Sequence, residues 1–302
     1  MKALLTLLMV IISSTAFGQT VPNSFSANTS AKAEEVNENF LHLANQFFYN
    51  KKSIDCSTDN LSQAIIDGFN YLTISGSCSA DLPIMIGNFD PGIINKLYGA
   101  NWSTPYPDVK QPLKMVIRGK TGRDTDSLKL TDNSSGSVLS LNYNGTLMAE
   151  GLTIIGDVTL RHNSSASISN SKITGGETNG SYNISLNLVN SSIEGEVEIG
   201  RNSSMKADNV TFTSKISISD LSHLDTNEES EIKDILEVEN GSNVNIYDTT
   251  LSGSGVVIET NRYSYVEVGN STVTNSGTGS CATGSAIDVD SDTTLTLSGC
   301  DL

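Results

Sequence analysis

Branched or aromatic apolar residues recur along the second half of this chain at a nearly constant spacing. The seven regular members of this apolar ladder are Ile154, Ile173, Ile193, Phe212, Ile232, Leu251 and Val273. A longer final step leads to Leu302 as a candidate eighth member. A repeat of about 20 residues is typical of stacked supersecondary units, so the spacing predicts a solenoid over residues 113–302.

Within each repeat, apolar and polar residues alternate with a period of two, which predicts strands with one buried face. Val158-Thr159-Leu160 and Val197-Glu198-Ile199 are two examples. An Asn or Asp stands three residues before the ladder residue in five repeats, where it favours a left-handed bend of the backbone. These five residues are Asn170, Asn190, Asn209, Asp248 and Asn270.

A single rung of this kind cannot bury its apolar side alone. Stacking rungs about 4.8 Å apart buries a continuous core and pairs each backbone amide with a neighbouring rung. The predicted fold class is therefore an all-β, parallel β-helix solenoid. Its uneven rung length favours the right-handed form, and the β-branched ladder disfavours a leucine-rich repeat. One rung, at about 216–232, is irregular, and its polar segment Asp225–Glu231 predicts an outward bulge.

The first 18 residues have the pattern of a signal peptide. Lys2 is followed by an apolar run from Ala3 to Ile12, and Ala16-Phe17-Gly18 then predicts cleavage after Gly18. The run is shorter than the roughly 20 residues of a membrane span, which disfavours an anchor. Since no later segment is apolar enough to cross a bilayer, we expect a protein that is secreted or held at the cell surface or in the periplasm.

Residues 19–52 predict a linker followed by an amphipathic helix. Val36, Phe40, Leu43 and Phe47 follow one another at steps of 4, 3 and 4, which is the spacing of a short coiled coil. A helix this short is marginal alone and must bury its apolar stripe. Two interpretations stay open: packing within the chain, or a homo-oligomer formed through residues 30–49.

Residues 53–112 predict the N-terminal cap, the first strands and a long loop. A short helix carrying Leu61 and Ala64 is expected after a cap at Asp59 or Ser62. The loop at 88–111 is long for a plain connection, so it either covers the core or binds a ligand. Three of its aromatic residues are candidates for stacking on a sugar: Tyr98, Trp102 and Tyr106.

The chain is strongly acidic, with a net charge of −16 that becomes −17 once Lys2 is removed. This charge disfavours nucleic acid and anionic membranes as partners, and it disfavours polyuronates unless bound cations mediate the contact. The four cysteines form two local pairs, Cys56 with Cys78 and Cys281 with Cys300, and the second pair spans about one repeat. An even count in an exported chain predicts two disulfides.

Acidic residues recur at one outward position of the repeats: Glu198, Glu237, Glu259 and Asp288. The last three are expected on consecutive rungs, where stacked carboxylates repel unless a cation lies between them. The hypothesis is a Ca²⁺ site formed by Glu237, Glu259 and Asp288, or an acidic face for a cationic partner. The alternative is a solvated acidic stripe, and no other cofactor is indicated.

Three segments carry a resemblance to known proteins. Leu61-Ser62-Gln63-Ala64-Ile65-Ile66-Asp67 and Leu72-Thr73-Ile74-Ser75-Gly76-Ser77-Cys78 resemble the opening of pectin-lyase-like parallel β-helix proteins. The resemblance implies a short helix that caps the coil. The region from Val21 to Phe40 resembles the N-terminal segment of various bacterial exported proteins, which implies a bacterial host. The β-helix family contains lyases, hydrolases and adhesins, so the resemblance alone does not assign an activity.

The residues favour binding over catalysis. The Asn-Thr-Asp and Gly-His-Gly motifs of polygalacturonase-like hydrolases are absent from the sequence, and His42, His162 and His223 are isolated. Acids are present, but no base stands near them in the expected register. We therefore expect an exported protein that presents an acidic polar surface for adhesion or carbohydrate binding, with polysaccharide or a cell-surface glycan as partner. The alternatives are a polysaccharide lyase or glycoside hydrolase, and a trimeric fibre or structural subunit.

Overall fold

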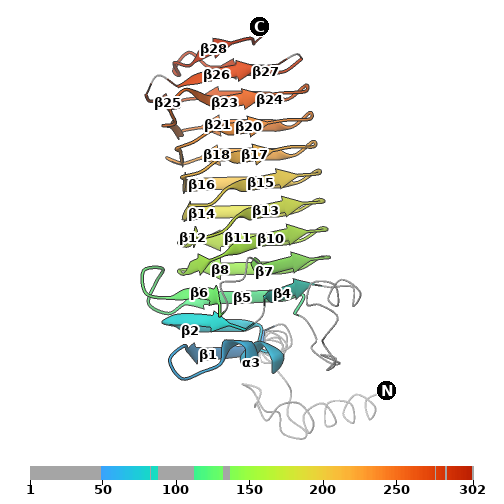
Figure 1. The fold of residues 1–302 in the computed structure, drawn as a ribbon, viewed down its shortest axis with the longest axis vertical. Helices are drawn as coiled ribbons and strands as arrows, with labels where there is room; N and C mark the ends of the chain where they lie inside the picture. Colours follow the sequence, from blue (N-terminus) through green and yellow to red (C-terminus); the bar gives the residue numbers. More distant parts are fainter. Residues whose placement is uncertain are drawn as a thin grey trace, which may run out of the picture. The chain divides into compact units, whose positions relative to one another are not determined.

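The computed structural model describes residues 49–81, 83–87, 112–131, 137–275, 277–282 and 284–300. The chain divides into two units, and the second of them begins at Lys51. The backbone of this second unit winds into a parallel β-helix of about 11 turns, in which successive turns stack on one another (Figure 1). The predicted fold class is confirmed.

Two parallel sheets form the coil. The 18-stranded sheet contains β1 (Lys51–Asp55), β2 (Tyr71–Ser75), β3 (Ser77–Ala80), β5 (Lys114–Gly119), β6 (Ser127–Leu130), β8 (Thr146–Glu150), β9 (Thr153–Ile155), β11 (Ser165–Ser169), β12 (Lys172–Thr174), β14 (Ser185–Ile193), β16 (Ser204–Phe212), β18 (His223–Asn227), β19 (Glu231–Ile232), β21 (Asn243–Tyr247), β22 (Thr250–Leu251), β24 (Tyr265–Gly269), β25 (Thr272–Val273) and β27 (Ala286–Val289). The 10-stranded sheet contains β4 (Ile84–Gly87), β7 (Ser137–Asn142), β10 (Asp157–Arg161), β13 (Thr178–Ser181), β15 (Val197–Gly200), β17 (Ile216–Ile218), β20 (Leu236–Val238), β23 (Val256–Thr260), β26 (Thr278–Cys281) and β28 (Thr296–Ser298).

Each turn of the coil has three faces. The large sheet bends once per turn, which divides it into a first face, with strands such as β11, β21 and β24, and a second face, with strands such as β12, β19 and β22. The small sheet forms the third face. The chain passes from the third face to the first and then to the second, as in β10, β11 and β12.

The apolar ladder lies on the second face, in the register that its spacing predicts. Ile154, Ile173 and Ile193 pair in sequence, and the pairing continues through Phe212, Ile232, Leu251 and Val273. The ladder residues from Ile154 to Leu251 are almost completely buried, and Val273 is half-buried. Leu302, the candidate eighth member, lies outside the described residues.

The Asn turns between the first and second faces are left-handed, as predicted. Asn170, Asn190, Asn209, Asp248 and Asn270 all have φ between 45° and 53°. Asn tolerates this conformation because its short polar side chain bonds locally. Stacked members also bond to each other: the Asn209 Nδ2 donates to Asn190 Oδ1 at 2.9 Å, and the Asn270 amide donates to Asp248.

In the middle of the coil, each turn between the third face and the first face contains two left-handed residues. Side chains from successive turns stack along the edge that these turns form. The ring centroids of Tyr143 and His162 are 4.5 Å apart, and those of His162 and Tyr182 are 4.6 Å apart. The Arg201 guanidinium lies 4.2 Å from the centroid of the Tyr182 ring. Because each ring covers its neighbour, the faces of His162 and Tyr182 are occupied within the protein.

Buried hydroxyl groups complete the hydrogen bonding at the turns. The Ile184 N–H donates to Ser203 Oγ, the Ser203 N–H to Ser222 Oγ and the Ser222 N–H to Ser242 Oγ, each at 3.2 Å. Similar hydrogen bonds occur at the Asn turns, where, for example, the Val210 N–H donates to Ser230 Oγ at 3.1 Å. These serines satisfy backbone amides that the strand ladder leaves unpaired.

We expect Ser203→Ala to lower the free energy of unfolding by about 1–3 kcal/mol, because it leaves the buried Ile184 amide without an acceptor. Chemical denaturation of the two proteins measures the difference. Ser204→Ala is the matched control, since Ser204 is exposed on the adjacent position of β16. Equal losses in the two variants would contradict the role assigned to the buried hydroxyl.

One helix lies among the described residues, α3 (Leu61–Ile66), and it buries Leu61 and Ala64. Its N-cap is Asn60, which accepts from the Gln63 N–H at 2.9 Å, so the prediction of Asp59 or Ser62 as cap was wrong. Asn is an equally good N-cap, and position 60 places its oxygen beside the free amide of the first turn. Strand β1 pairs in register with β2, and β2 pairs in register with β5, so the coil begins at Lys51. The signal segment and the helix predicted within residues 30–49 fall almost wholly outside the described residues.

The expected outward bulge at Asp225–Glu231 was also wrong. Asp225 lies inside β18, in register with Lys206 on one side and Asn245 on the other. Its polar side chain points outward while Leu224 and Thr226 are buried, so the segment keeps the period of two. The turn to β19 consists of Glu228 and Glu229, which are left-handed, and the buried Ser230.

Both predicted disulfides are present. Cys56 pairs with Cys78 and Cys281 pairs with Cys300, with Cα–Cα distances of 4.8 Å and 4.7 Å. Each bond joins adjacent turns, because β26 and β28 pair directly and the Cys56 N–H donates to the Ser75 carbonyl. The disulfides therefore tie neighbouring rungs together near both ends of the described coil.

Candidate functional site

The structure brings together two of the three predicted metal ligands. Glu237 and Glu259 pair in register on β20 and β23 of the third face. Glu198 belongs to the same outward column, with Ser217 between it and Glu237. The column is thus acidic, as the spacing predicts, but Ser217 interrupts the row of carboxylates.

Asp288 does not belong to this column, so the expected register of the third ligand was wrong. It lies on β27 of the first face, in register with Glu267 on β24. Strand β20 on the third face and strand β27 on the first face both carry an apolar–acid–apolar alternation. The alternation alone therefore does not show which face a strand joins. The position that follows Glu259 on the third face is Ser280.

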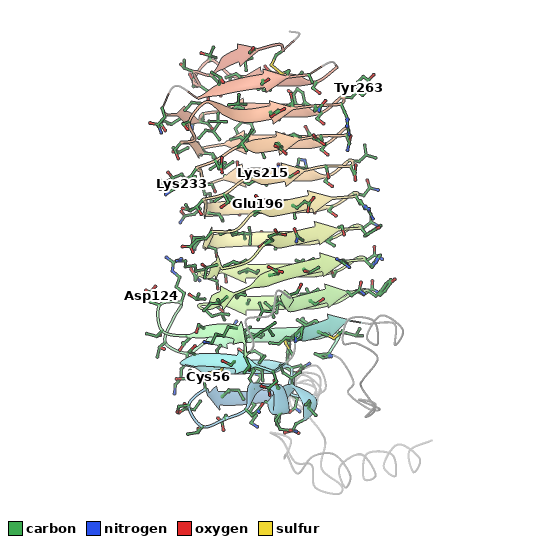
Figure 2. All side chains as sticks on the ribbon, viewed as in Figure 1. Cys56, Asp124, Glu196, Lys215, Lys233 and Tyr263 are labelled. Atoms are coloured by element: carbon green, nitrogen blue, oxygen red, sulfur yellow. A yellow bond between two sulfur atoms is a disulfide. The ribbon has the colours of Figure 1, made fainter. Side chains whose placement is uncertain are left out.

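A lysine occupies the acidic face. The Lys215 Nζ lies 2.7 Å from Glu237 Oε2, and Figure 2 shows Lys215 close to Glu196. A hydrogen bond to Glu237, opposed by desolvation and helped by the charges of Glu237, Glu196 and Glu198, raises the pKa of Lys215. Within the described residues, no three His, Cys, Asp or Glu side chains are grouped as a metal site would require.

The three aromatic residues predicted to stack on a sugar, Tyr98, Trp102 and Tyr106, lie outside the described residues. A different aromatic cluster appears on the last turns of the coil. We name it the tyrosine–carboxylate surface, and it consists of Tyr247, Tyr263, Tyr265, Glu267 and Asp288.

Tyr263 is the most exposed part of this surface. It lies in the turn between β23 and β24, is 80% exposed, and projects from the edge of the coil (Figure 2). One side of its ring rests on Gly284, where an added Cβ would lie 2.6 Å from the ring carbon Cδ1. Gly284 also has φ +79°, so glycine is favoured there by both space and backbone conformation. The ring is therefore supported on one side and open to solvent on the other.

Tyr247 and Glu267 form the inner part of the surface. The Tyr247 hydroxyl donates a hydrogen bond to Glu267 Oε1, and the ring lies over Gly269, which has no side chain to displace it. The hydrogen bond to Glu267, then burial and the charges of Glu267 and Asp290, raises the pKa of Tyr247 to about 12. The phenol consequently stays protonated at neutral pH and donates its hydrogen bond to Glu267.

Tyr265 and Asp288 repeat this arrangement one turn further along. Tyr265 is 37% exposed, and its hydroxyl donates to Asp288 Oδ2 at 3.4 Å. Burial and the charge of Asp288 raise the pKa of Tyr265. Among the described residues, no Lys, Arg or His forms an ion pair with Glu267 or Asp288. The surface thus combines exposed ring area with carboxylate acceptors that carry uncompensated charge.

Aromatic faces and carboxylate oxygens together suit a sugar, since pyranose C–H groups pack on a ring while hydroxyls donate to acids. Reasoning from the sequence missed this surface. The closely spaced Tyr263-Ser264-Tyr265 was a visible signal, and the separation of Glu267 from Asp288 matches one turn of the coil. The misplaced register of Asp288 hid that match.

Comparison with known proteins finds no matching family model, no similar curated protein and no similar solved structure. The resemblance to pectin-lyase-like proteins therefore rests on the parallel β-helix alone. A search of the described residues finds no helix with the length and hydropathy that a membrane crossing requires.

Proposed function

We propose that this protein is exported and binds a polysaccharide or cell-surface glycan without transforming it, through the tyrosine–carboxylate surface. The observation that carries the proposal is the ring of Tyr263, supported by Gly284 and open on its other side, in the turn that leads into β24. On β24 and β27, Glu267 and Asp288 pair in register and lack a cationic partner among the described residues. Two disulfides support export, because such bonds persist in oxidising compartments.

The charge of the surface defines the class of sugar. Glu267 and Asp288 repel a uronate or sulfate group and attract the ammonium of an amino sugar. A neutral hydroxyl-rich sugar also fits, because it donates to the carboxylates. We therefore propose neutral or amino-sugar glycans as ligands of this surface.

The chemistry of the phenols favours binding over bond cleavage. A lyase needs a group that accepts a proton, and a general base acts best when its pKa lies near the working pH. The pKa of Tyr247 is about 12 and that of Tyr265 is also raised, so both phenols stay protonated. Their hydroxyl hydrogens are bonded to Glu267 and Asp288, so the phenols hold these carboxylates in place and can accept hydrogen bonds from sugar hydroxyls.

A glycan array probed with the full chain tests the proposal. We expect binding to neutral or amino-sugar glycans, and Tyr263→Ala should weaken it about tenfold, as the loss of one aromatic anchor costs more than about 1 kcal/mol. Tyr182→Ala is the matched control, because Tyr182 is exposed in the corresponding turn but stacked on its neighbours. Equal binding by wild type and Tyr263→Ala would reject this surface as the site.

Incubation of any bound glycan with the protein then separates binding from catalysis. Intact glycan supports the proposal, whereas new reducing ends or unsaturated products would show that the protein is a hydrolase or a lyase. A weak Ca²⁺ site at Glu237 and Glu259 and a homo-oligomer formed through residues 30–49 stay proposals.

A further inference from the structure

A polar hollow lies beside the left-handed Asn turns, away from the tyrosine–carboxylate surface. It has a volume of about 410 Å³. Its floor is the Asn ladder and the adjacent second-face residues of β14 and β16, and a loop between β5 and β6 forms one wall. Its lining includes Arg123, Asn170, Asn190, Ser192, Asn209 and Thr211.

The loop that carries Arg123 is held in place by a buried carboxylate. Asp126 is completely buried and accepts from the N–H groups of Gly76 at 2.8 Å and Gly122 at 3.1 Å, and from the hydroxyl of Thr121 at 2.9 Å. The Thr153 hydroxyl also donates to the Arg123 carbonyl at 2.6 Å. Asp124 marks this loop at the edge of the coil in Figure 2. The fold therefore fixes the backbone of Arg123 from two sides.

The Arg123 side chain reaches from this loop to β14. Its Nη1 donates to the Asn190 carbonyl at 3.4 Å, which is a long hydrogen bond. A guanidinium has five N–H donors. Within the described part of the chain, the bond to Asn190 is the one hydrogen bond that the Arg123 side chain makes to protein. Most of its donors are thus available to a ligand.

The hollow differs in charge from the rest of the protein. The chain has 34 Asp and Glu against 18 Lys and Arg, yet no acidic residue is among those that line the hollow in the described structure. No carboxylate in the described ranges pairs with Arg123, whereas Lys172, Lys206, Lys215 and Lys233 each have an acidic partner. An unpaired cation in an acid-free hollow favours an anionic ligand.

The other lining groups are donors of the same kind. The Asn209 Nδ2 donates to Asn190 Oδ1 at 2.9 Å, which occupies the oxygen of Asn190 and leaves its amino group as a donor. Ser192 and Thr211 add hydroxyl groups from neighbouring rungs. Guanidinium, amide and hydroxyl donors that converge from several directions match the oxygens of a tetrahedral oxyanion. We infer that this hollow binds a sulfate or phosphate group.

Calorimetric titration of the full chain tests the inference, with sodium sulfate, sodium phosphate, dextran sulfate and plain dextran as probes. We expect the three anionic probes to bind with an affinity that falls as salt rises, and plain dextran not to bind. Arg123→Gln should weaken binding at least about tenfold, because it removes the charge and the fork of donors. Asn190→Asp should abolish it, since it places a negative charge in the hollow.

The backbone accommodates the second substitution, because Asp248 occupies an equivalent left-handed position further along the coil with φ 47°. The matched controls are Lys120→Gln, in the same loop but outside the lining, and Asn163→Asp, which is left-handed with φ 61° on another edge. Both controls should bind like wild type. Melting temperatures of all variants separate a loss of binding from a loss of fold.

Each outcome decides the inference. A loss of anion binding in Arg123→Gln and Asn190→Asp, but not in the two control variants, supports the oxyanion site. If dextran sulfate binds more tightly than free sulfate, per sulfate group, the natural ligand is a sulfate ester on a glycan. If the two bind equally, the natural ligand is a free ion. No binding by any anion, or equal weakening in the controls, overturns it. Tyr263→Ala should leave this binding unchanged, so the result is independent of the proposed glycan surface.

Discussion

Phe212→Ala is expected to lower the free energy of unfolding by about 3–5 kcal/mol, the cost typical of removing a buried aromatic side chain. Phe212 is 1% exposed and is the largest member of the apolar ladder, in register with Ile193 on one side and Ile232 on the other. Its removal leaves a cavity in the middle of the coil, where rungs on both sides limit relaxation. Chemical denaturation followed by circular dichroism measures the loss.

Two further variants make this prediction specific. Phe212→Leu should lower the free energy of unfolding much less, because Leu251 fills the corresponding ladder position on another rung. Thr211→Ala, on the neighbouring outward position, should change stability by about 0.5 kcal/mol or less. Because each rung contacts mainly its neighbours, we also expect the unfolding of Phe212→Ala to broaden as the two halves of the coil lose cooperativity. A loss below about 1 kcal/mol would mean that the ladder is not close-packed at this rung.

Asp126→Ala is expected to lower the free energy of unfolding by about 3 kcal/mol, because the partly buried donors of Gly76, Thr121 and Gly122 lose their buried acceptor at about 1 kcal/mol or more each. The carboxylate joins β2–β3, the loop that carries Arg123 and β6 in one hydrogen-bonded cluster. Asp124→Ala is the control: it removes the same charge from an exposed position of the same loop and should be nearly neutral. Equal stability of the two variants would contradict the assigned role.

The pH dependence of this effect has a defined sign. Burial opposes ionisation of Asp126, but the hydrogen bonds from Gly76, Thr121 and Gly122 outweigh it and lower the pKa of Asp126. The stabilisation is therefore complete above the unfolded pKa of about 3.9 and is lost as pH falls through the lower folded value. The stability difference between wild type and Asp126→Ala should accordingly be constant near neutral pH and shrink in strong acid.

The same variant connects stability to the oxyanion hollow. Since Asp126 orders the loop that carries Arg123, Asp126→Ala should weaken sulfate binding even though Asp126 does not line the hollow. Asp124→Ala should not weaken it.

The repetitive part of the fold could be predicted because its determinants are local. The alternation of Val158-Thr159-Leu160 and the bend at Asn170 each depend on a few neighbouring residues. The regular spacing of the ladder then places Ile173 between Ile154 and Ile193. The cysteine pairs follow from the same spacing, because one turn separates each cysteine from its partner.

The stacking of rungs, the residues of the ladder and the two disulfides could thus be predicted from the order of residues along the chain. The face that each strand joins could not, as Asp288 shows, because turn length varies and two faces carry the same alternation. The tertiary structure also sets which distant side chains meet: Tyr263 rests on Gly284, and Arg123 reaches the far-separated Asn190. Such contacts depend on the path of turns and loops through space, which a period along the chain does not encode.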